Sequence, residues 1–391
     1  MSFPSDFVVG ASTSAHQTEG QNTTSDWWLF EQSRAGELEP SGRACDSWNR
    51  WRDDLDLAAG AGLSAHRFSI EWARIEPEEG RFADEAIEHY RQVVEGARER
   101  GIEPILTLHH FTNPAWFALG GGWLRPDAVA LFARYVDRVA PVIEAGVDRV
   151  ITINEPNVVA IMARVIAGEV SFDNGLGAGL PLPNERVRDQ LIAAHHAARE
   201  RLRARHSSLA VGWSIANQVV QSVDGGADRA DAYREAIEDV WLRAAAHDDL
   251  VGVQAYTRTV FGPEGKIEPA ADAARTLTGW EYYPEALGEA VRHTAHLLPG
   301  VPILVTENGI ATDDDAQRVA YTTGALRGLA DAMADGADVR GYLHWSLLDN
   351  YEWGHWGPTF GLASVEPETF HRTAKPSLAW LGELARSHRV P

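Results

Sequence analysis

The chain has 391 residues and a formal net charge of −21, because 56 Asp and Glu outnumber 35 Lys and Arg. That negative field disfavours nucleic acid and anionic membrane surfaces as partners, and no run of about twenty apolar residues could span a bilayer. With one cysteine, Cys45, and no signal-peptide pattern at the N-terminus, the expected location is the cytoplasm.

Short apolar runs alternate with longer helical segments along the whole chain. The predicted strands are residues 7–12, 65–70, 104–110, 149–155, 209–216, 250–256, 302–307 and 340–346. The predicted helices are residues 51–62, 84–100, 126–145, 185–205, 231–247, 284–297, 314–334 and 376–387. This alternation predicts an α/β fold with a parallel sheet and right-handed crossovers. Eight rounds of it predict a closed (β/α)8 TIM barrel that uses residues 1–391 as a single catalytic domain.

Polar and aromatic residues gather where the predicted strands end. Active sites of such barrels lie at the C-terminal ends of the strands, so these residues are candidates for one site. In chain order they are Gln17 and Glu19, Arg67 and Glu71, His109 and His110, Asn154 and Glu155, Asn217, Gln254 and Tyr256, Glu307 and Asn308, and Trp345.

Two of these strand ends carry a glutamate followed by a turn residue. Glu155 precedes Pro156, and Glu307 precedes Asn308 and Gly309. Two carboxylates at one end of a barrel can perform glycoside hydrolysis, one of them as an acid that protonates the leaving oxygen. As structural alternatives, Glu155 could be an acid near a helix N-terminus, and Glu307 could serve turn chemistry.

Neither a cofactor nor a metal is expected. The glycine pattern at 175, 177 and 179 does not follow a predicted strand, as a dinucleotide site requires. His109 and His110 have no third ligand at metal spacing, and His109 is expected to be a packed or hydrogen-bonded side chain.

Several segments together resemble glycoside hydrolase family 1, the β-glucosidase family. They occur in the family's order and at fitting spacings, at Phe7–Gly20, Arg67–Ile75, Leu106–His110, Thr152–Pro156, Gly279–Pro284, Thr306–Gly309 and Trp345–Trp353. The resemblance covers nearly the whole chain. It implies a retaining exo-β-glycosidase, foremost a β-glucosidase with possible β-galactosidase or β-fucosidase activity, that acts on small β-glycosides or oligosaccharides.

The resemblance also implies a role for each site residue. Glu155 would be the general acid/base and Glu307 the nucleophile of a double displacement. Arg67 would keep Glu307 ionised, Tyr256 would hydrogen-bond it, and Asn154 would contact the sugar 2-hydroxyl. The sugar-binding residues implied by the family are Gln17, His110, Glu352 and Trp353, with Trp345 under the ring and Trp280 against the aglycone.

This chain departs from the family pattern at two positions. Phe111 stands where many members have Trp, and Gln254 stands where many have Asn. The longer Gln254 amide could still bond to Glu307 or to the 2-hydroxyl. Two other functions stay open from the sequence: a transglycosidase on the same site, and a non-catalytic carbohydrate-binding barrel, which the presence of both glutamates disfavours.

Overall fold

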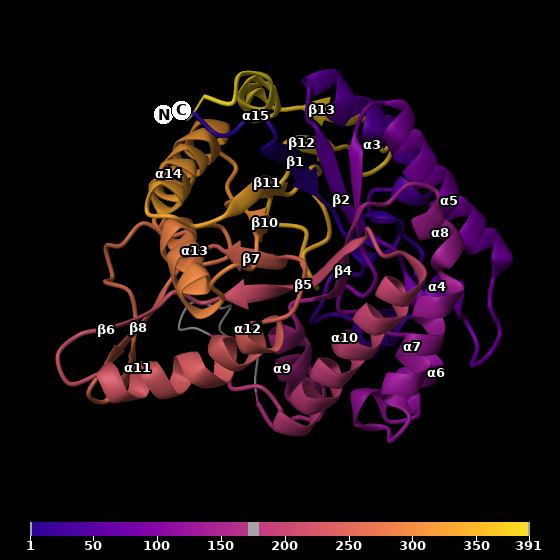
Figure 1. Ribbon diagram of the computed structural model, residues 1–391, viewed down its shortest axis with the longest axis horizontal. Coiled ribbons are helices and arrows are strands. Elements are labelled where there is room, and N and C mark those ends of the chain that lie inside the picture. The colour runs from indigo at the N-terminus through magenta and orange to yellow at the C-terminus, as the bar shows by residue number, and fades with distance from the viewer. Residues whose placement is uncertain (1, 171–179, 390–391) are drawn as a thin grey trace.

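A computed structural model describes residues 2–170 and 180–389 of the chain. Its centre is a closed parallel barrel of eight strands, in the spatial order β1-β11-β10-β7-β5-β4-β3-β2 (Figure 1). The strands are β1 (Val8–Ser12), β2 (Ala65–Ser69), β3 (Glu103–Thr107), β4 (Arg149–Asn154), β5 (Ala210–Asn217), β7 (Val251–Ala255), β10 (Ile303–Asn308) and β11 (Val339–Trp345). The predicted TIM barrel is therefore confirmed, with each strand within a few residues of its predicted position.

Helices between successive barrel strands, and one after the last strand, surround the barrel (Figure 1). They are α3 (Ser47–Ala61), α5 (Asp84–Glu99), α7 (Ala128–Arg138), α8 (Ala140–Glu144), α10 (Glu185–Arg205), α11 (Ala227–Arg234), α12 (Val240–Ala244), α13 (Ala286–Leu297), α14 (Asp315–Ala334) and α15 (Pro376–Ser387). The segment predicted as one helix at 126–145 is divided into α7 and α8, because Pro141 in the first turn of α8 cannot donate a backbone hydrogen bond.

Shorter elements that the sequence patterns did not predict lie in the connections. The helices are α1 (Ala15–Thr18), α2 (Asp26–Ser33), α4 (Trp72–Ile75), α6 (Ala115–Leu119), the 3-10 helix η1 (Gly122–Leu124) and α9 (Pro156–Ile166). The π-helix η3 (Glu235–Asp239), by contrast, lies inside the helix predicted at 231–247, between α11 and α12. The strands are β6 (Val220–Ser222), β8 (Thr259–Gly262), β9 (Gly265–Ile267), β12 (Ala363–Val365) and β13 (Arg372–Ala374). The predicted glycine-rich loop at 175–179 lies outside the described residues.

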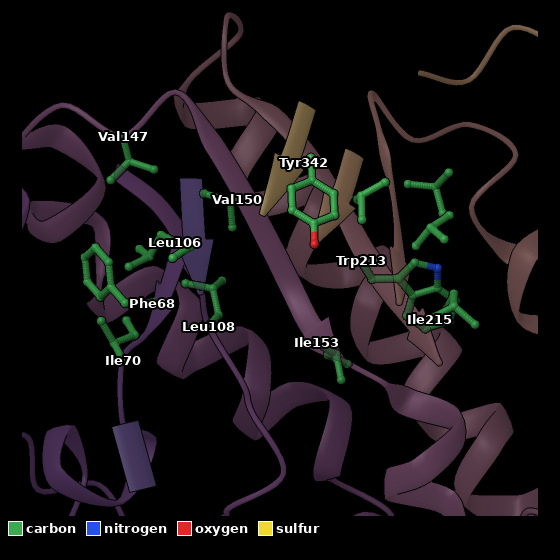
Figure 2. Close-up of a cluster of buried hydrophobic side chains, with 14 of the residues drawn as sticks. Phe68, Ile70, Leu106, Leu108, Val147, Val150, Ile153, Trp213, Ile215 and Tyr342 are labelled. Carbon is green, nitrogen blue, oxygen red and sulfur yellow. The ribbon is translucent and has the colours of Figure 1, made fainter. Parts of the chain in front are cut away.

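Apolar side chains fill the barrel and the space around it. Inside the barrel, one layer comes from alternate strand positions, including Val8, Ile105 and Leu304. Outside, a larger core lies between strands and helices, and Figure 2 shows Phe68, Leu106, Val150 and other members of it. The two sets follow the inward and outward alternation that a half-buried strand requires.

This alternation breaks at the ends of the two strands that carry the glutamates. In β4 the pairing register with β5 shifts between Ile151 and Asn154, and in β10 the register with β7 shifts between Val305 and Glu307. Such irregularities turn a strand end and redirect its last side chains. Asn154 and Glu307 consequently lie three positions after the inward-facing Ile151 and Leu304 instead of two.

The two ends of the described chain meet beside α15 (Figure 1). The Phe3 amide donates to the His388 carbonyl at 2.8 Å, which joins the segment before β1 to the end of the last helix. Across residues 2–170 and 180–389, no helix combines the length and apolar character needed to cross a membrane.

Arg318 ties together two loops at the active end of the barrel. Its side chain is buried on α14 and donates to the carbonyls of Ile310 and Thr312 after β10, and of Thr359 and Phe360 after β11. These bonds satisfy backbone oxygens that cannot reach water.

We predict that Arg318→Met lowers the free energy of unfolding by about 3 kcal/mol, because four carbonyls each lose a charged donor and the ion pair of Arg318 with Asp315 is lost. Urea unfolding followed by circular dichroism measures this. The matched control is Arg340→Met, which removes an exposed ion pair with Asp338 and is expected to change stability by less than about 0.5 kcal/mol. Equal losses in the two variants would contradict this assignment of Arg318.

Candidate active site

A pocket opens at the C-terminal end of the barrel strands. Its volume is about 810 Å³ with the space at the open mouth included. Side chains from β-strand ends and the following loops line it: Gln17, His110, Phe111, Glu155, Val158, Leu180, Ala216, Asn217, Gln218, Gln254, Tyr256, Thr257, Trp280, Glu307, Trp345, Glu352 and Trp353. The predicted site residues Arg67 and Asn154 lie directly behind this lining.

Arg67 is the buried cation beneath the pocket. Its guanidinium has no exposed surface, and it donates from Nη1 to Glu307 Oε1 at 2.6 Å and from Nη2 to Asn154 Oδ1 at 2.5 Å. Its Nε donates to Thr107 Oγ1 at 2.9 Å. Side chains of β2, β3, β4 and β10 are thus joined through one residue. Because a buried guanidinium needs an anionic partner, this geometry favours an ionised Glu307.

Asn154 is held in one orientation by its neighbours. Arginine can only donate, so the Asn154 atom that faces Arg67 must be the carbonyl oxygen. That oxygen also accepts from Ser214 Oγ at 3.1 Å and from Gln254 Nε2 at 2.9 Å. The amide nitrogen of Asn154 is left on the other side, 3.3 Å from His110 Nε2.

Tyr256 supplies a second donor to Glu307. Its hydroxyl lies 2.7 Å from Glu307 Oε2, so the two carboxylate oxygens of Glu307 bond to different residues. Gln254, which is paired with Glu307 across β7 and β10, adds a weaker contribution that also favours the charged form. The Gln254 carbonyl oxygen is buried without a partner among the described residues, as is the Trp280 indole nitrogen.

Glu155 lies at a sharp turn between β4 and α9. Its φ is 43°, a left-handed conformation that costs a non-glycine residue roughly 1–3 kcal/mol. The Glu155 amide donates to the Ser214 carbonyl at 2.8 Å. Asn157, two residues later, bonds to both backbone groups of Ala216, at 2.9 Å and 3.3 Å, and to the Ile237 carbonyl in η3. These bonds hold the strained turn against β5.

The two glutamates have different proton affinities. Burial raises the pKa of Glu155 well above its usual value, and the nearby Glu307 charge raises it further. Burial also raises the pKa of Glu307, but Arg67 and the Tyr256 hydroxyl oppose that rise. Two close carboxyls cannot both ionise easily. The direct bonds of Glu307 to Arg67 and Tyr256 therefore favour the proton on Glu155 and the negative charge on Glu307.

A second cluster of polar side chains, Glu352 and Gln17, lies at the inner end of the pocket. Glu352 accepts from Trp345 Nε1 at 3.2 Å and from Gln17 Nε2 at 3.2 Å. Gln17 is fixed by Ser14, which donates to its oxygen at 2.7 Å, and by the Tyr351 carbonyl, which accepts from its nitrogen at 2.9 Å. Burial raises the pKa of Glu352 well above its usual value.

Aromatic rings form a ladder beside this polar group. The ring of Trp353 is nearly parallel to that of His16 on one side and to that of His110 on the other, at interplanar angles of 8° and 9°. His110 in turn is nearly parallel to Trp345. Burial and the neighbouring Arg67 lower the pKa of His110 well below its usual value, so His110 is a neutral ring. Phe111 meets Trp353 edge-on at 5.0 Å.

Some strand-end residues singled out from the sequence do not line the pocket. Glu19 pairs with Arg74 and accepts from the Tyr90 hydroxyl, and Glu71 caps α4. His109 is buried and bonds to Asn113 at 3.0 Å, as expected for a packed histidine. Across the described part of the chain, no three His, Cys, Asp or Glu side chains converge as a metal site requires.

Sequence reasoning missed several residues of the pocket wall. Ala216 and Gln218 flank Asn217 at the end of β5, and Thr257 follows Tyr256, so a wider search at strand ends could have found them. Val158 in the first turns of α9 and Leu180 in a loop carry no such signal. Their presence depends on how α9 and the loop fold over the barrel.

Comparisons with known proteins agree on one family. The sequence profile described as "Glycosyl hydrolase family 1" matches residues 1–261 and 262–390. Thermostable beta-glucosidase B of Thermobispora bispora is 30% identical over 99% of this chain and 91% of its own. A bifunctional beta-D-glucosidase/beta-D-fucosidase of Bifidobacterium breve is 30% identical over 99% of both chains.

A solved structure is also closely similar. The crystal structure of beta-glycosidase BGL167 matches with a TM-score of 0.89 and 41% identity, over 98% of this chain and 97% of that chain. With this match in both sequence and barrel geometry, the chain belongs to glycosyl hydrolase family 1 and is a β-glycosidase.

Proposed function

We propose that this protein is a retaining exo-β-glycosidase, foremost a β-glucosidase, that releases terminal β-linked sugars from small glycosides. The observation that carries the proposal is the unequal pair of buried glutamates. Glu307 lies 2.6 Å from the Arg67 guanidinium, while the pKa of Glu155 is raised well above its usual value. A nucleophile must be ionised and a general acid must be protonated, and this pair meets both conditions.

The first chemical step uses both glutamates at once. Glu307 attacks the anomeric carbon as the bond from that carbon to the leaving oxygen breaks, and Glu155 gives its proton to that oxygen. The products are a glycosyl ester on Glu307 and a free alcohol. Arg67 and Tyr256 orient the attacking carboxylate through their bonds to its two oxygens.

In the second step Glu155 accepts a proton, whereas in the first step it donates one. Burial, the larger cause of the raised pKa of Glu155, persists, but the Glu307 charge that raises this pKa further disappears when the ester forms, so the pKa of Glu155 falls. Glu155 can then ionise and accept a proton from water, which attacks the anomeric carbon and releases the sugar with its original configuration. Glu307 becomes a carboxylate again.

The inner end of the pocket fits a sugar ring. Glu352 and Gln17 offer hydrogen bonds to hydroxyls, together with the neutral His110, and Trp345 and Trp353 offer apolar ring faces. Asn154 has its carbonyl occupied, so its amide nitrogen is the group available to the 2-hydroxyl. Glucose is favoured, and the bifunctional relative named above makes a 6-deoxy sugar a second glycone to test.

The remaining expectations belong to the same proposal. Trp280 provides an aromatic wall for the aglycone at the mouth. Residues 1–391 act as one catalytic domain, which is supported by barrel strands that run from Val8 to Trp345. A cytoplasmic location is supported by Cys45, whose thiol is free and buried.

We predict that Glu307→Gly abolishes hydrolysis of p-nitrophenyl β-glucoside, with a loss of at least about 10⁴-fold in kcat, because no nucleophile remains. Azide, which fits the space left by the side chain, is expected to restore nitrophenol release and to yield the inverted glycosyl azide. Nitrophenol absorbance and NMR of the product measure both. Glu264→Gly, in an exposed turn, is the matched control and is expected to keep wild-type activity.

A different result would identify a different nucleophile. Wild-type rates in Glu307→Gly, or a rescued azide of retained configuration, would contradict the assigned role of Glu307. Failure of the folded wild type to hydrolyse any β-glycoside would overturn the proposed function itself.

We predict a bell-shaped pH dependence of kcat/KM for the wild type. Activity is lost as pH falls, because Glu307 gains a proton, and it is lost as pH rises through the elevated pKa of Glu155, because the acid is then ionised. In Glu155→Ala the alkaline decline is expected to disappear.

The leaving group provides the control for this assignment. Dinitrophenolate needs no protonation, so kcat/KM for dinitrophenyl β-glucoside is expected to change little in Glu155→Ala. With methyl β-glucoside the loss is expected to be about 10²–10⁴-fold. An alkaline decline that persists in the variant would show that another group supplies the proton.

A further inference from the structure

Among the described residues, the polar side chains of the outer wall of the pocket are mostly bonded within the protein. Asn217 donates from Nδ2 to Glu238 Oε1 at 2.6 Å, and its Oδ1 accepts from the backbone N–H of Gln254 at 3.1 Å. The Thr257 hydroxyl donates to the Glu281 carbonyl at 3.0 Å. Both polar side chains are therefore engaged by the protein, whereas the Gln218 side chain and the unpartnered Trp280 indole nitrogen are the other polar groups of this wall among the described residues.

Apolar side chains occupy the rest of the outer wall. Val158 comes from α9, Leu180 from the loop before α10, Ala216 from β5 and Trp280 from the loop before α13. At the inner end Glu352, Gln17 and His110 also bond within the protein, but the two carboxylate oxygens of Glu352 each keep a lone pair that a sugar hydroxyl could use. A second sugar would lose hydrogen bonds to water on the outer wall, because each hydroxyl without a partner costs about 1–3 kcal/mol.

Trp280 is packed against rings at the end of β7 and after β11. Its ring centroid lies 5.4 Å from that of Tyr256 and 6.1 Å from that of Phe360. Its backbone amide donates to Thr276 Oγ1 at 3.2 Å. These ring contacts orient the indole. The loop that carries Trp280 is held to the barrel by a separate set of contacts.

An ion pair between Arg258 and Glu281, called the arginine clamp below, connects the Trp280 loop to the barrel. Arg258, two residues after Tyr256, donates from Nε and Nη2 to the two carboxylate oxygens of Glu281, both at 2.8 Å. Glu281 directly follows Trp280, and its carbonyl accepts from Thr257. A bidentate pair fixes distance and direction together. The clamp therefore sets where the Trp280 loop lies relative to the nucleophile-bearing side of the pocket.

Further contacts restrain the arginine itself. Arg258 Nη1 donates to Gln221 Oε1 at 3.1 Å, and the guanidinium lies over the Tyr283 ring, 4.3 Å from its centroid. Gln221 also donates to the Tyr283 hydroxyl at 3.0 Å and to Glu289 at 2.7 Å. The network connects β6 and α13 to the mouth, so the Trp280 loop has several points of attachment.

We propose that the outer half of the pocket binds flat apolar aglycones in preference to a second sugar, and that Arg258 is the positioning residue that holds Trp280 against them. The proposal rests on the β-glycosidase function stated above and names the substrate class of that site. The chemical class is a β-glycoside of an aryl or arylalkyl alcohol.

Substrates whose leaving alcohols have similar acidity differ mainly in how their aglycones bind, so their rates can be compared directly. Wild-type kcat/KM is measured for three substrates: 2-phenylethyl β-glucoside, methyl β-glucoside and the disaccharide cellobiose. We expect 2-phenylethyl β-glucoside to exceed methyl β-glucoside by about tenfold or more, as burial of one ring predicts, and to exceed cellobiose. A higher value for cellobiose than for 2-phenylethyl β-glucoside would overturn the apolar assignment. Inactivity on all three would instead indicate failure of the proposed function.

The role of Arg258 is tested with Arg258→Met, Trp280→Ala and the double variant. Arg258→Met is expected to raise KM for 2-phenylethyl β-glucoside by about fivefold to tenfold and to change kcat by less than about twofold, because binding and not the reacting groups is disturbed. The preference for 2-phenylethyl over methyl is expected to fall equally in Trp280→Ala and in the double variant.

Controls separate positioning from general destabilisation. Arg258→Lys keeps the charge and is expected to restore part of the aglycone preference, which also covers a failure of Arg258→Met to fold. Arg292→Met removes an exposed ion pair with Asp335 and is expected to leave the preference unchanged. An unchanged preference in Arg258→Met, or effects of Arg258→Met and Trp280→Ala that simply add, would contradict the positioning role.

Discussion

The active end of this barrel depends on one buried guanidinium. Arg67 has no exposed surface, so its charge requires a carboxylate and its nitrogens require acceptors. Glu307, Asn154 and Thr107 meet that requirement from three other strands. The same bonds keep Glu307 ionised and turn the Asn154 nitrogen toward the pocket. Losing the cation would leave both the charge and the orientation of these groups undefined.

Around this cation, the backbone departs from regular geometry where the chemistry occurs. Register shifts redirect the ends of β4 and β10, and Glu155, Phe111 and Trp353 adopt positive φ. Each such residue costs stability, and neighbouring bonds offset the cost. For Glu155 the Ser214 carbonyl and the Asn157 side chain hold the turn. The barrel thus tolerates strain at its active end because regular strands and a dense core support it.

The described lining of the pocket divides into a polar inner end and a largely apolar outer wall. At the inner end, carboxylate, amide and imidazole groups face the space that a sugar would occupy, with indole rings beside them. At the outer end, the polar side chains of Asn217 and Thr257 are used within the protein, and an ion pair fixes the aromatic wall. The same pocket can therefore bind a sugar ring at its inner end and an apolar group at its outer end.

Much of this could be predicted from local sequence. Apolar runs that alternate with helical segments predict the barrel, and the end of each strand predicts which residues share a face, because both signals are local and repeat along the chain. Glu155, Glu307 and Gln254 were found in this way, whereas Ala216, Gln218 and Thr257 at strand ends were not. Only the tertiary structure decided how the Asn154 amide is turned and that Val158 and Leu180 line the mouth, and it alone provides a physical reason, in burial and in the bonds of Arg67 and Tyr256, for a difference in pKa between the two glutamates. Those outcomes depend on burial and on contacts between segments that are far apart in the chain, such as Arg67 with Glu307, and no local pattern encodes such contacts before the barrel closes.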